Sequence, residues 1–296
     1  KNSSFSYNGM NGLDITSKGY ITLVDVQGYH NYGSYGARIS NSTGTGNVSV
    51  TCSGPAYCNF TANTLMGLRI YAAGMITLKN VDASGNPSGA VLWNLNGAGK
   101  SVTVTNGNFS DSTSSYGLQI TTTGPVILTN VISDGNMGLG TAIDSTSASK
   151  AQIVKITNSS FNSNQGGNGL EIYSLGSVTL NGIQANGNAS SGAHIDTCVY
   201  DGAILACRGS GSVTVVGKEN LFNDNGDAGL YMVTRFGATL NNISASNNDT
   251  GLMIWHNYTN CSGNISINAS SGFTNTISGN NAYGIYIEAY GNITLQ

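Results

Sequence analysis

The sequence predicts an all-β solenoid of about eleven coils, with three short strands in each coil. Three observations support this prediction: a glycine-anchored tetrapeptide recurs along the whole chain, an alternating apolar segment follows each copy, and successive copies begin 22 to 37 residues apart. A coil of three short strands and three turns needs a little over about 20 residues. Because one such coil cannot bury its own apolar side chains, the coils must stack on one another.

The first strand of each coil lies in the tetrapeptide, which most often reads G-L-x-I. Its second and fourth residues face the core and its third faces outward, because successive side chains of a strand alternate. The eleven copies begin at Gly12, Gly36, Gly67, Gly89, Gly117, Gly140, Gly169, Gly192, Gly229, Gly251 and Gly284.

The second strand is predicted by strict apolar–polar alternation, which is typical of a half-buried strand. An Asn-, Ser- and Gly-rich stretch with one or two apolar residues follows it, and we expect a third, shorter strand and a turn there. The alternating segments are Ile21–Leu23, Val48–Val50, Ile76–Leu78, Val102–Val104, Val126–Leu128, Val154–Ile156, Val178–Leu180, Val213–Val215, Ala238–Leu240, Ile265–Ile267 and Ile293–Leu295.

Short and long coils alternate along most of the chain. Short coils have 22 to 24 residues and long coils 28 to 37. We expect the extra residues of the long coils to form loops on one face. At the inter-strand spacing of about 4.8 Å, eleven coils make a rod roughly 50 Å long.

The G-L-x-I and I-T-L-x-N-V segments and the Asn-rich turns resemble the repeats of the pectate-lyase-like superfamily, over essentially the whole chain. The resemblance implies a right-handed parallel β-helix, which would span residues 1–296 as a single domain. It also implies an asparagine ladder at one turn, where side-chain amides satisfy turn backbone. The candidates, which follow the second strand in four successive coils, are Asn80, Asn106, Asn130 and Asn158.

The low charge content argues against several classes of function. Charged residues make up 8% of the chain, and 11 basic against 14 acidic residues give a net charge of −3, so a nucleic-acid partner is not expected. No apolar run reaches the roughly 20 residues that span a bilayer. His30, His194 and His256 lie far apart, and no His/Cys spacing fits zinc, so we expect neither metal nor cofactor.

The best candidates for catalysis are four outward residues on neighbouring coils, Asp144, Glu171, His194 and Asp196. Asp144 and Asp196 are two coils apart, so their backbones lie about 9.6 Å apart. This is near the upper end of the carboxylate separation in inverting glycoside hydrolases. Glu171 beside His194 is either an acid/base pair or a surface ion pair. Chance accounts for outward acids this close, and no polygalacturonase motif or calcium-binding aspartate cluster is present, so we expect no enzymatic activity.

Six outward aromatic residues are candidates for contact with a carbohydrate or with another protein. Flat rings can stack on sugar faces, pack in an interface, lie under loops of the long coils, or pair with one another across strands, and the sequence leaves these alternatives open. The six are Tyr71, Trp93, Tyr173, Tyr231, Trp255 and Tyr286.

The cysteines and glycosylation motifs favour an extracellular or cell-surface location. Cys52 with Cys58 and Cys198 with Cys207 are close enough to clip loops as disulfides, with Cys261 left over; alternatively, all five are buried thiols. Asn-x-Ser/Thr motifs fit a glycosylated secreted chain. They begin at Asn2, Asn41, Asn47, Asn59, Asn108, Asn158, Asn188, Asn242, Asn248, Asn257, Asn260, Asn264, Asn268 and Asn292.

The two ends of the sequence suggest how the chain associates. It begins within a third strand at Asn2–Phe5 and stops at Gln296, directly after a second strand, with no cap at either end. Uncapped solenoids expose strand edges. Either the chain is a segment of a longer surface protein, or identical copies stack head to tail into a filament.

From these observations we predict an extracellular structural β-helix protein of a cell-surface fibre, sheath or adhesin. Its partner would be a second copy of itself or the rest of a longer surface protein. The alternative is a β-helix protein that binds or degrades a polysaccharide, as a lyase or hydrolase, with the outward face around Asp144 to Tyr231.

Overall fold

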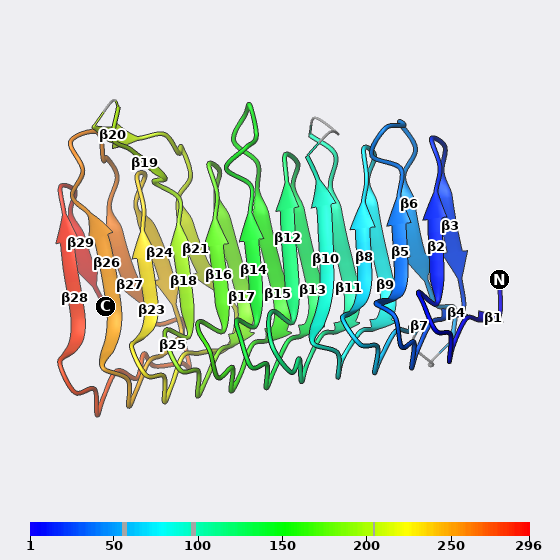
Figure 1. The fold of residues 1–296 in the computed structure, drawn as a ribbon. Helices are drawn as coiled ribbons and strands as arrows, with labels where there is room; N and C mark the ends of the chain where they lie inside the picture. The colour runs from blue at the N-terminus through cyan, green and yellow to red at the C-terminus, as the bar shows by residue number, and fades with distance from the viewer. Residues whose placement is uncertain (55–57, 96–98, 204) are drawn as a thin grey trace.

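The computed structural model describes residues 1–54, 58–95, 99–203 and 205–296, and these residues form strands, turns and loops without a helix. Two long parallel sheets run along the molecule, and the chain passes from one to the other in every coil (Figure 1). The coils stack from the blue N-terminal end to the red C-terminal end. The chain is a right-handed parallel β-helix, so the predicted fold class is confirmed.

The first sheet has eleven strands, one for each G-L-x-I copy, arranged in chain order. Neighbouring strands are parallel and in register: Leu68 lies beside Ala90, and Ile70 beside Leu92. The strands are β2 (Leu13–Thr16), β5 (Tyr35–Ser40), β8 (Met66–Tyr71), β10 (Ser88–Asn94), β12 (Leu118–Thr122), β14 (Thr141–Asp144), β16 (Leu170–Tyr173), β18 (Ala193–Asp196), β23 (Ala228–Val233), β26 (Thr250–His256) and β28 (Tyr283–Ala289).

The second sheet contains one strand for each alternating segment, together with three short strands. The main strands are β3 (Ile21–Val24), β6 (Val48–Thr51), β9 (Ile76–Asp82), β11 (Val102–Asn108), β13 (Val126–Ile132), β15 (Val154–Ser160), β17 (Val178–Gln184), β21 (Val213–Val216), β24 (Ala238–Asn241), β27 (Ile265–Asn268) and β29 (Ile293–Leu295). The short strands are β7 (Cys58–Asn59), β22 (Asn220–Leu221) and β25 (Ile243–Ser244).

The predicted third strand is a separate element only in part of the chain. In β9, β11, β13, β15 and β17 the second strand continues through a bend into the third segment. Pairing resumes beyond the bend residue: Thr105 lies beside Lys79, and Gly107 beside Val81. Elsewhere short pairs stand alone, such as β1 (Ser3–Ser4) with β4 (Val26–Gln27).

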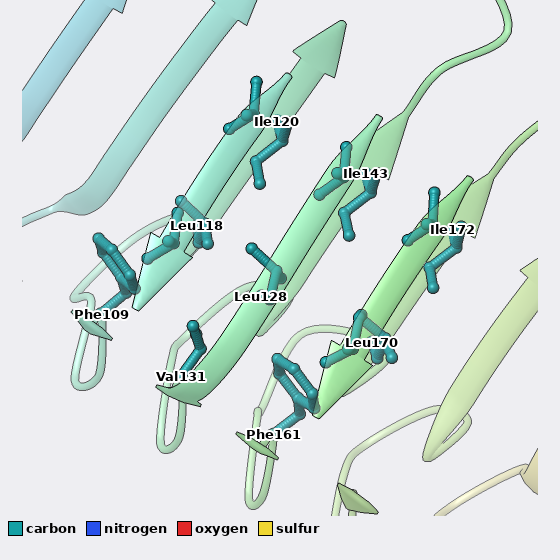
Figure 2. Packing of buried hydrophobic residues seen from close by; sticks show 14 of the residues in the cluster. Phe109, Leu118, Ile120, Leu128, Val131, Ile143, Phe161, Leu170 and Ile172 are labelled. Atoms are coloured by element: carbon teal, nitrogen blue, oxygen red, sulfur yellow. The ribbon is translucent and has the colours of Figure 1, made fainter. Parts of the chain in front are cut away.

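The interior consists of apolar columns that run along the axis. Leu118 and Ile120 of the first sheet face Leu128 of the second, and the same arrangement repeats coil after coil (Figure 2). Burying one such side chain contributes roughly 1.5–3 kcal/mol. The third segment supplies the largest fully buried side chains, which are Phe60, Phe109, Phe161 and Phe222.

A buried asparagine column, which the sequence analysis did not identify, links the coils at the turn before the first sheet. Asn164 shows the pattern: its Oδ1 accepts hydrogen bonds from the N and Nδ2 of Asn136, at 3.0 and 2.9 Å. Its own N and Nδ2 donate to Asn188 Oδ1, both at 2.9 Å. The column contains Asn8, Asn31, Asn63 and Asn86, then Ser112, then Asn136, Asn164, Asn188, Asn225, Asn248 and Asn280.

This column helps to explain why glycine begins most copies of the tetrapeptide. A Cβ on Gly36 would lie 2.7 Å from Nδ2 of Asn63 and 2.6 Å from the carbonyl oxygen of Gly67. The same collision with the column would occur at Gly169, where Nδ2 of Asn188 lies 2.7 Å from the Cβ position. Glycine is therefore required by the close approach of the next coil.

The predicted asparagine ladder occupies the bend between the second and third segments. All four candidates have positive φ, from 49° at Asn158 to 53° at Asn80 and Asn106, and Gly182 takes the same conformation one coil further on. Asn tolerates this left-handed region better than other non-glycine residues. Asn106 Nδ2 donates to Asn80 Oδ1 at 2.9 Å, and Asn130 Nδ2 to Asn106 Oδ1 at 3.0 Å.

Most extra residues of the long coils form loops beyond the C-terminal ends of the first-sheet strands, at the top of Figure 1. The largest connects β18 to β21 and contains the antiparallel pair β19 (Tyr200–Asp201) and β20 (Ala206–Cys207). A Cys198–Cys207 disulfide closes this loop, and a Cys52–Cys58 disulfide closes the loop between β6 and β7. Cys261 is a free thiol.

We expect Asn164→Ala to lower the free energy of unfolding by about 2–4 kcal/mol, because the buried N and Nδ2 of Asn136 lose their shared acceptor and Asn188 Oδ1 loses one of its two donors from Asn164. Urea unfolding followed by circular dichroism measures this loss. The control is Asn130→Gly, which removes an exposed amide of the outer ladder. Equal losses in the two variants would contradict a special role for the buried column.

At the outer bend, the positive φ of Asn130 predicts that two substitutions of this residue differ in their effect on stability. Asn130 has a φ of 52°, so Asn130→Gly should be tolerated, whereas Asn130→Val should cost about a further 1–2 kcal/mol. Both variants lose the same side-chain hydrogen bond, so the difference between their melting curves isolates the backbone term. Identical melting temperatures would show that the bend relaxes.

Candidate functional site

The outer face of the first sheet displays the predicted site residues in two columns. In each strand, the third residue of the tetrapeptide and the residue after its final position point away from the core. Because the strands are in register, side chains from successive coils become neighbours. The central parts of the columns are Glu171, His194 and Tyr231, and Asp144, Tyr173 and Asp196.

Three rings from successive strands pack together at the centre of this face. The rings of His194 and Tyr231 stack with centroids 4.6 Å apart and an interplanar angle of 16°. Tyr173 meets His194 edge-on at 5.5 Å. Beside them, Glu171 Oε2 accepts a hydrogen bond from Asn168 Nδ2 at 2.8 Å. The result is a row of packed rings bordered by an anchored carboxylate.

Partial burial controls the protonation of this cluster. Desolvation lowers the pKa of the His194 imidazole, although the carboxylates of Glu171, Asp196 and Asp227 oppose the shift. Burial raises the pKa of the Tyr173 phenol, and nearby carboxylates add to this effect. Near neutral pH the site therefore offers an uncharged imidazole, which can accept a proton or a hydrogen bond, and a protonated phenol as donor.

The structure does not support Asp144 and Asp196 as an acid/base pair. Tyr173 lies between them in the register. Asp144 Oδ1 accepts hydrogen bonds from the N and Oγ1 of Thr146, at 2.9 and 2.7 Å. Asp196 Oδ1 accepts from the backbone N of Cys198 and of Val199, at 2.8 and 2.7 Å. Both carboxylates therefore close the turns that follow their strands. Burial raises the pKa of the Asp196 carboxyl group.

The remaining outward aromatic residues also contact rings on neighbouring strands. Tyr71 meets Trp93 edge-to-face with centroids 4.8 Å apart, and Trp255 lies 5.8 Å from Tyr286. Cross-strand packing, one of the alternatives left open, therefore occurs throughout the group. Trp93 is still 38% exposed, so these rings also present area to solvent.

Loops cover the C-terminal part of the face through contacts that the sequence did not predict. The Tyr200 and Tyr258 rings stack 5.0 Å apart, although the residues come from different long loops. Asn260 hydrogen-bonds both the N and the carbonyl oxygen of Cys207, at 3.1 and 2.9 Å. Cys261 packs on the cluster formed by the Cys198–Cys207 disulfide and neighbouring side chains. No periodic pattern marks these loop residues in the sequence.

Several hollows lie on the surface of the described residues, and two of them adjoin the candidate site residues or the predicted asparagine ladder. A cleft of about 220 Å³ on the outer face is lined by Gln119, Asp144, Glu171 and Tyr173 among others, directly beside the ring cluster. A larger hollow of about 750 Å³ follows the outer asparagine bend, away from the candidate residues of the first sheet. The smaller cleft is therefore the one that joins the predicted site.

Four of the predicted glycosylation positions are inaccessible. Asn188 and Asn248 belong to the buried column, and the Nδ2 groups of Asn41 and Asn242 donate to backbone carbonyl groups within the fold. A glycan is attached through Nδ2, so these side chains cannot accept one without unfolding. The exposed candidates are Asn2, Asn158, Asn264 and Asn292.

Within the described ranges, no three His, Cys, Asp or Glu side chains converge as a metal site would require. The same residues contain no helix with the length and apolar character needed to cross a membrane.

Among solved structures, the chain is similar to the A-module of mannuronan C-5 epimerase AlgE6 from Azotobacter vinelandii. The match covers 96% of this chain and 79% of that one, at 12% identity and a TM-score of 0.41. This likeness concerns the fold, and no residue role is transferred from it. No curated protein sequence matches the chain.

Our prediction that the chain is not an enzyme is corrected by this comparison. That prediction rested on the chance placement of outward acids and on the lack of a known catalytic motif, whereas the similar solved structure is a module of an enzyme. The β-helix architecture itself hosts catalytic proteins as well as structural ones, so the fold gives no ground for excluding catalysis.

A family model matches the chain and agrees with the fold that the repeats and the stacked sheets indicate. The model described as "Right handed beta helix region" matches residues 11–182, which is more than half of the chain. The chain belongs to the right-handed β-helix family.

Proposed function

We propose that this protein binds a polysaccharide along the outer face of its first sheet. The observation that supports the proposal is the packed row of Tyr173, His194 and Tyr231 on three successive strands, next to the Glu171 carboxylate and the adjoining cleft. Flat rings with polar atoms at their edges suit sugars, which have apolar ring faces and hydroxyl-rich rims.

The geometry of the sheet favours a linear ligand. A chain lying along the solenoid axis would cross the strands and meet a new outward residue about every 4.8 Å. Glu171 supplies a hydrogen-bond acceptor, the Tyr173 phenol a donor, and the neutral His194 imidazole either one. These groups match the alternating donors and acceptors of successive hydroxyl groups.

We also propose that the protein acts outside the cell. The two disulfides support this location, because such bonds persist in oxidising compartments. The fibre, sheath or adhesin role and the head-to-tail assembly stay predictions from the sequence.

Tyr173→Ala and Tyr231→Ala should each weaken polysaccharide binding about tenfold, since each removes aromatic contact area and a hydroxyl together worth about 1.5 kcal/mol. Affinity electrophoresis against a panel of soluble neutral and acidic polysaccharides measures the change. Glu171→Gln should also weaken binding, because an amide replaces a carboxylate acceptor.

The matched control is Tyr20→Ala, which removes a tyrosine that is 78% exposed in the turn before β3, outside the first sheet. It should bind as the wild type does. If the wild type binds no polysaccharide in the panel, or if all variants bind equally, the proposed site is wrong.

The buried imidazole predicts a pH dependence of stability. Below about pH 6.5 the unfolded chain protonates His194, while the folded protein takes up this proton only at lower pH, because burial lowers the pKa. Stability is therefore lost as the pH falls. The melting temperature of the wild type should drop more between about pH 7.5 and 5.5 than that of His194→Gln, which lacks the imidazole but keeps the surrounding carboxylates. Equal drops would contradict this assignment.

A further inference from the structure

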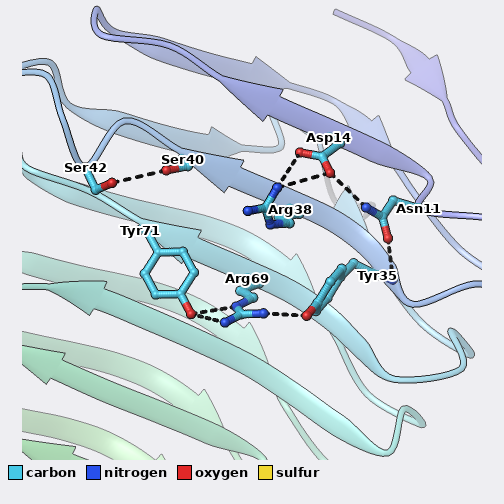
Figure 3. A network of polar contacts seen from close by, with 8 residues as sticks. All are labelled: Asn11, Asp14, Tyr35, Arg38, Ser40, Ser42, Arg69 and Tyr71. Atoms are coloured by element: carbon cyan, nitrogen blue, oxygen red, sulfur yellow. Dashed lines mark hydrogen bonds and ion pairs between the residues drawn. The ribbon is translucent and has the colours of Figure 1, made fainter.

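At the N-terminal part of the same face, one arginine is held rigidly by two phenols. Arg69 of β8 donates to the Tyr71 hydroxyl from Nε at 2.8 Å and also from Nη2, and its Nη1 donates to the Tyr35 hydroxyl (Figure 3). Its guanidinium carbon lies 4.7 Å from the centroid of the Tyr71 ring and 5.4 Å from that of Tyr35. The side chain is thus fixed in one position, with little conformational entropy left to lose on binding.

Arg69 differs in its surroundings from the two arginines that form ion pairs. Arg38 forms an ion pair with Asp14 at 3.2 Å, and Arg208 lies 4.0 Å from Asp201. Among the described residues, no carboxylate forms an ion pair with Arg69. Its register neighbour on β5 is Arg38, a like charge, and on β10 it is Val91. Adjacent like charges on a sheet are destabilising, so stability does not account for this pair.

Some N–H groups of the Arg69 guanidinium are not engaged by the two phenols, so this group can bind a ligand. Arginine has five N–H donors in a planar fork, and the two phenols engage Nε, Nη1 and Nη2 once each. Two donors are therefore left. A carboxylate or sulfate accepts two parallel N–H bonds from such a fork, which adds direction as well as strength.

We propose that Arg69, with Arg38 beside it, binds the anionic group of an acidic polysaccharide, so that the ligand of the outer face carries carboxylate or sulfate groups. The proposal rests on the proposed function, because the same face must hold the rest of the polymer. Trp93 and Tyr71 next to Arg69 provide ring area for the sugar that bears the charge.

The acidic residues of the face leave Arg69 available to this ligand, because Asp14 is ion-paired with Arg38 and the carboxylates of the ring cluster lie further along the axis. β8 and β16 are four strand spacings apart, so Arg69 and Glu171 are separated by about 19 Å along the axis. This exceeds the Debye length of about 8 Å at physiological salt. The anionic group therefore docks at the N-terminal part, and the ring cluster around His194 contacts sugar hydroxyls.

The test compares polymers that differ only in charge. Polygalacturonate is paired with its fully methyl-esterified form, and dextran sulfate with dextran. We expect the acidic member of at least one pair to bind at least tenfold more tightly, and the pair that responds identifies carboxylate or sulfate as the group. Raising NaCl from about 50 to 200 mM should weaken the acidic member's binding.

Arg69→Gln should remove about tenfold of the affinity for the acidic polymer and reduce its salt dependence, while leaving binding of the neutral polymer unchanged. Lys79→Gln is the matched control, because it removes one positive charge from the second sheet of the same coil. Tyr71→Phe retains the ring but removes the hydroxyl that anchors Arg69. It should cost the acidic polymer about threefold, and it serves as a second variant if Arg69→Gln does not fold.

The outcomes separate the two proposals. If neutral polymers bind through Tyr173 and Tyr231 but acidic ones bind no better, or if Arg69→Gln and Lys79→Gln behave alike, the anionic subsite is wrong and the binding face stands. If no polymer of either kind binds, both proposals are wrong.

Discussion

The buried asparagine column is the interaction on which the rest of the structure depends. Each amide joins two coils at the turn that leads into the first sheet. Without these amides, buried backbone N–H groups of the turn would have no hydrogen-bond partner. The amide of Asn164 both accepts from one coil and donates to the next. Because it sits against the glycine of the tetrapeptide, it also fixes where each first strand begins. The register of the outward columns follows from that starting point.

The sequence was sufficient to predict what repeats locally. Alternating segments such as Val126–Leu128 and the tetrapeptides gave the strands of both sheets, and the asparagines at the outer bend gave a corner that needs positive φ. The buried column was missed because asparagine is expected in exposed turns. An Asn three to five residues before most of the anchoring glycines was the available signal.

For the candidate site, the sequence could predict which outward residues are neighbours along each column, but not the contacts made by the loops. Register places Glu171 beside His194, and this follows from counting residues after each glycine. The turn-closing hydrogen bonds of Asp144 and Asp196 depend on the loops that follow them. The contact between Tyr200 and Tyr258 joins two loops with no common pattern, so a sequence without periodicity at those positions could not indicate it.

The fixed register has a consequence for how a family of such proteins can change its ligand. The interval between Arg69 and Glu171 is a whole number of coils, and no side-chain substitution can adjust it by a fraction. Gaining or losing one coil of about 23 residues would lengthen or shorten the interval by a single step of about 4.8 Å. In the proposed binding mode, the distance between the two ends of the site therefore changes only in steps of one coil, and selectivity for the spacing of groups along a polymer can evolve by duplication of a coil.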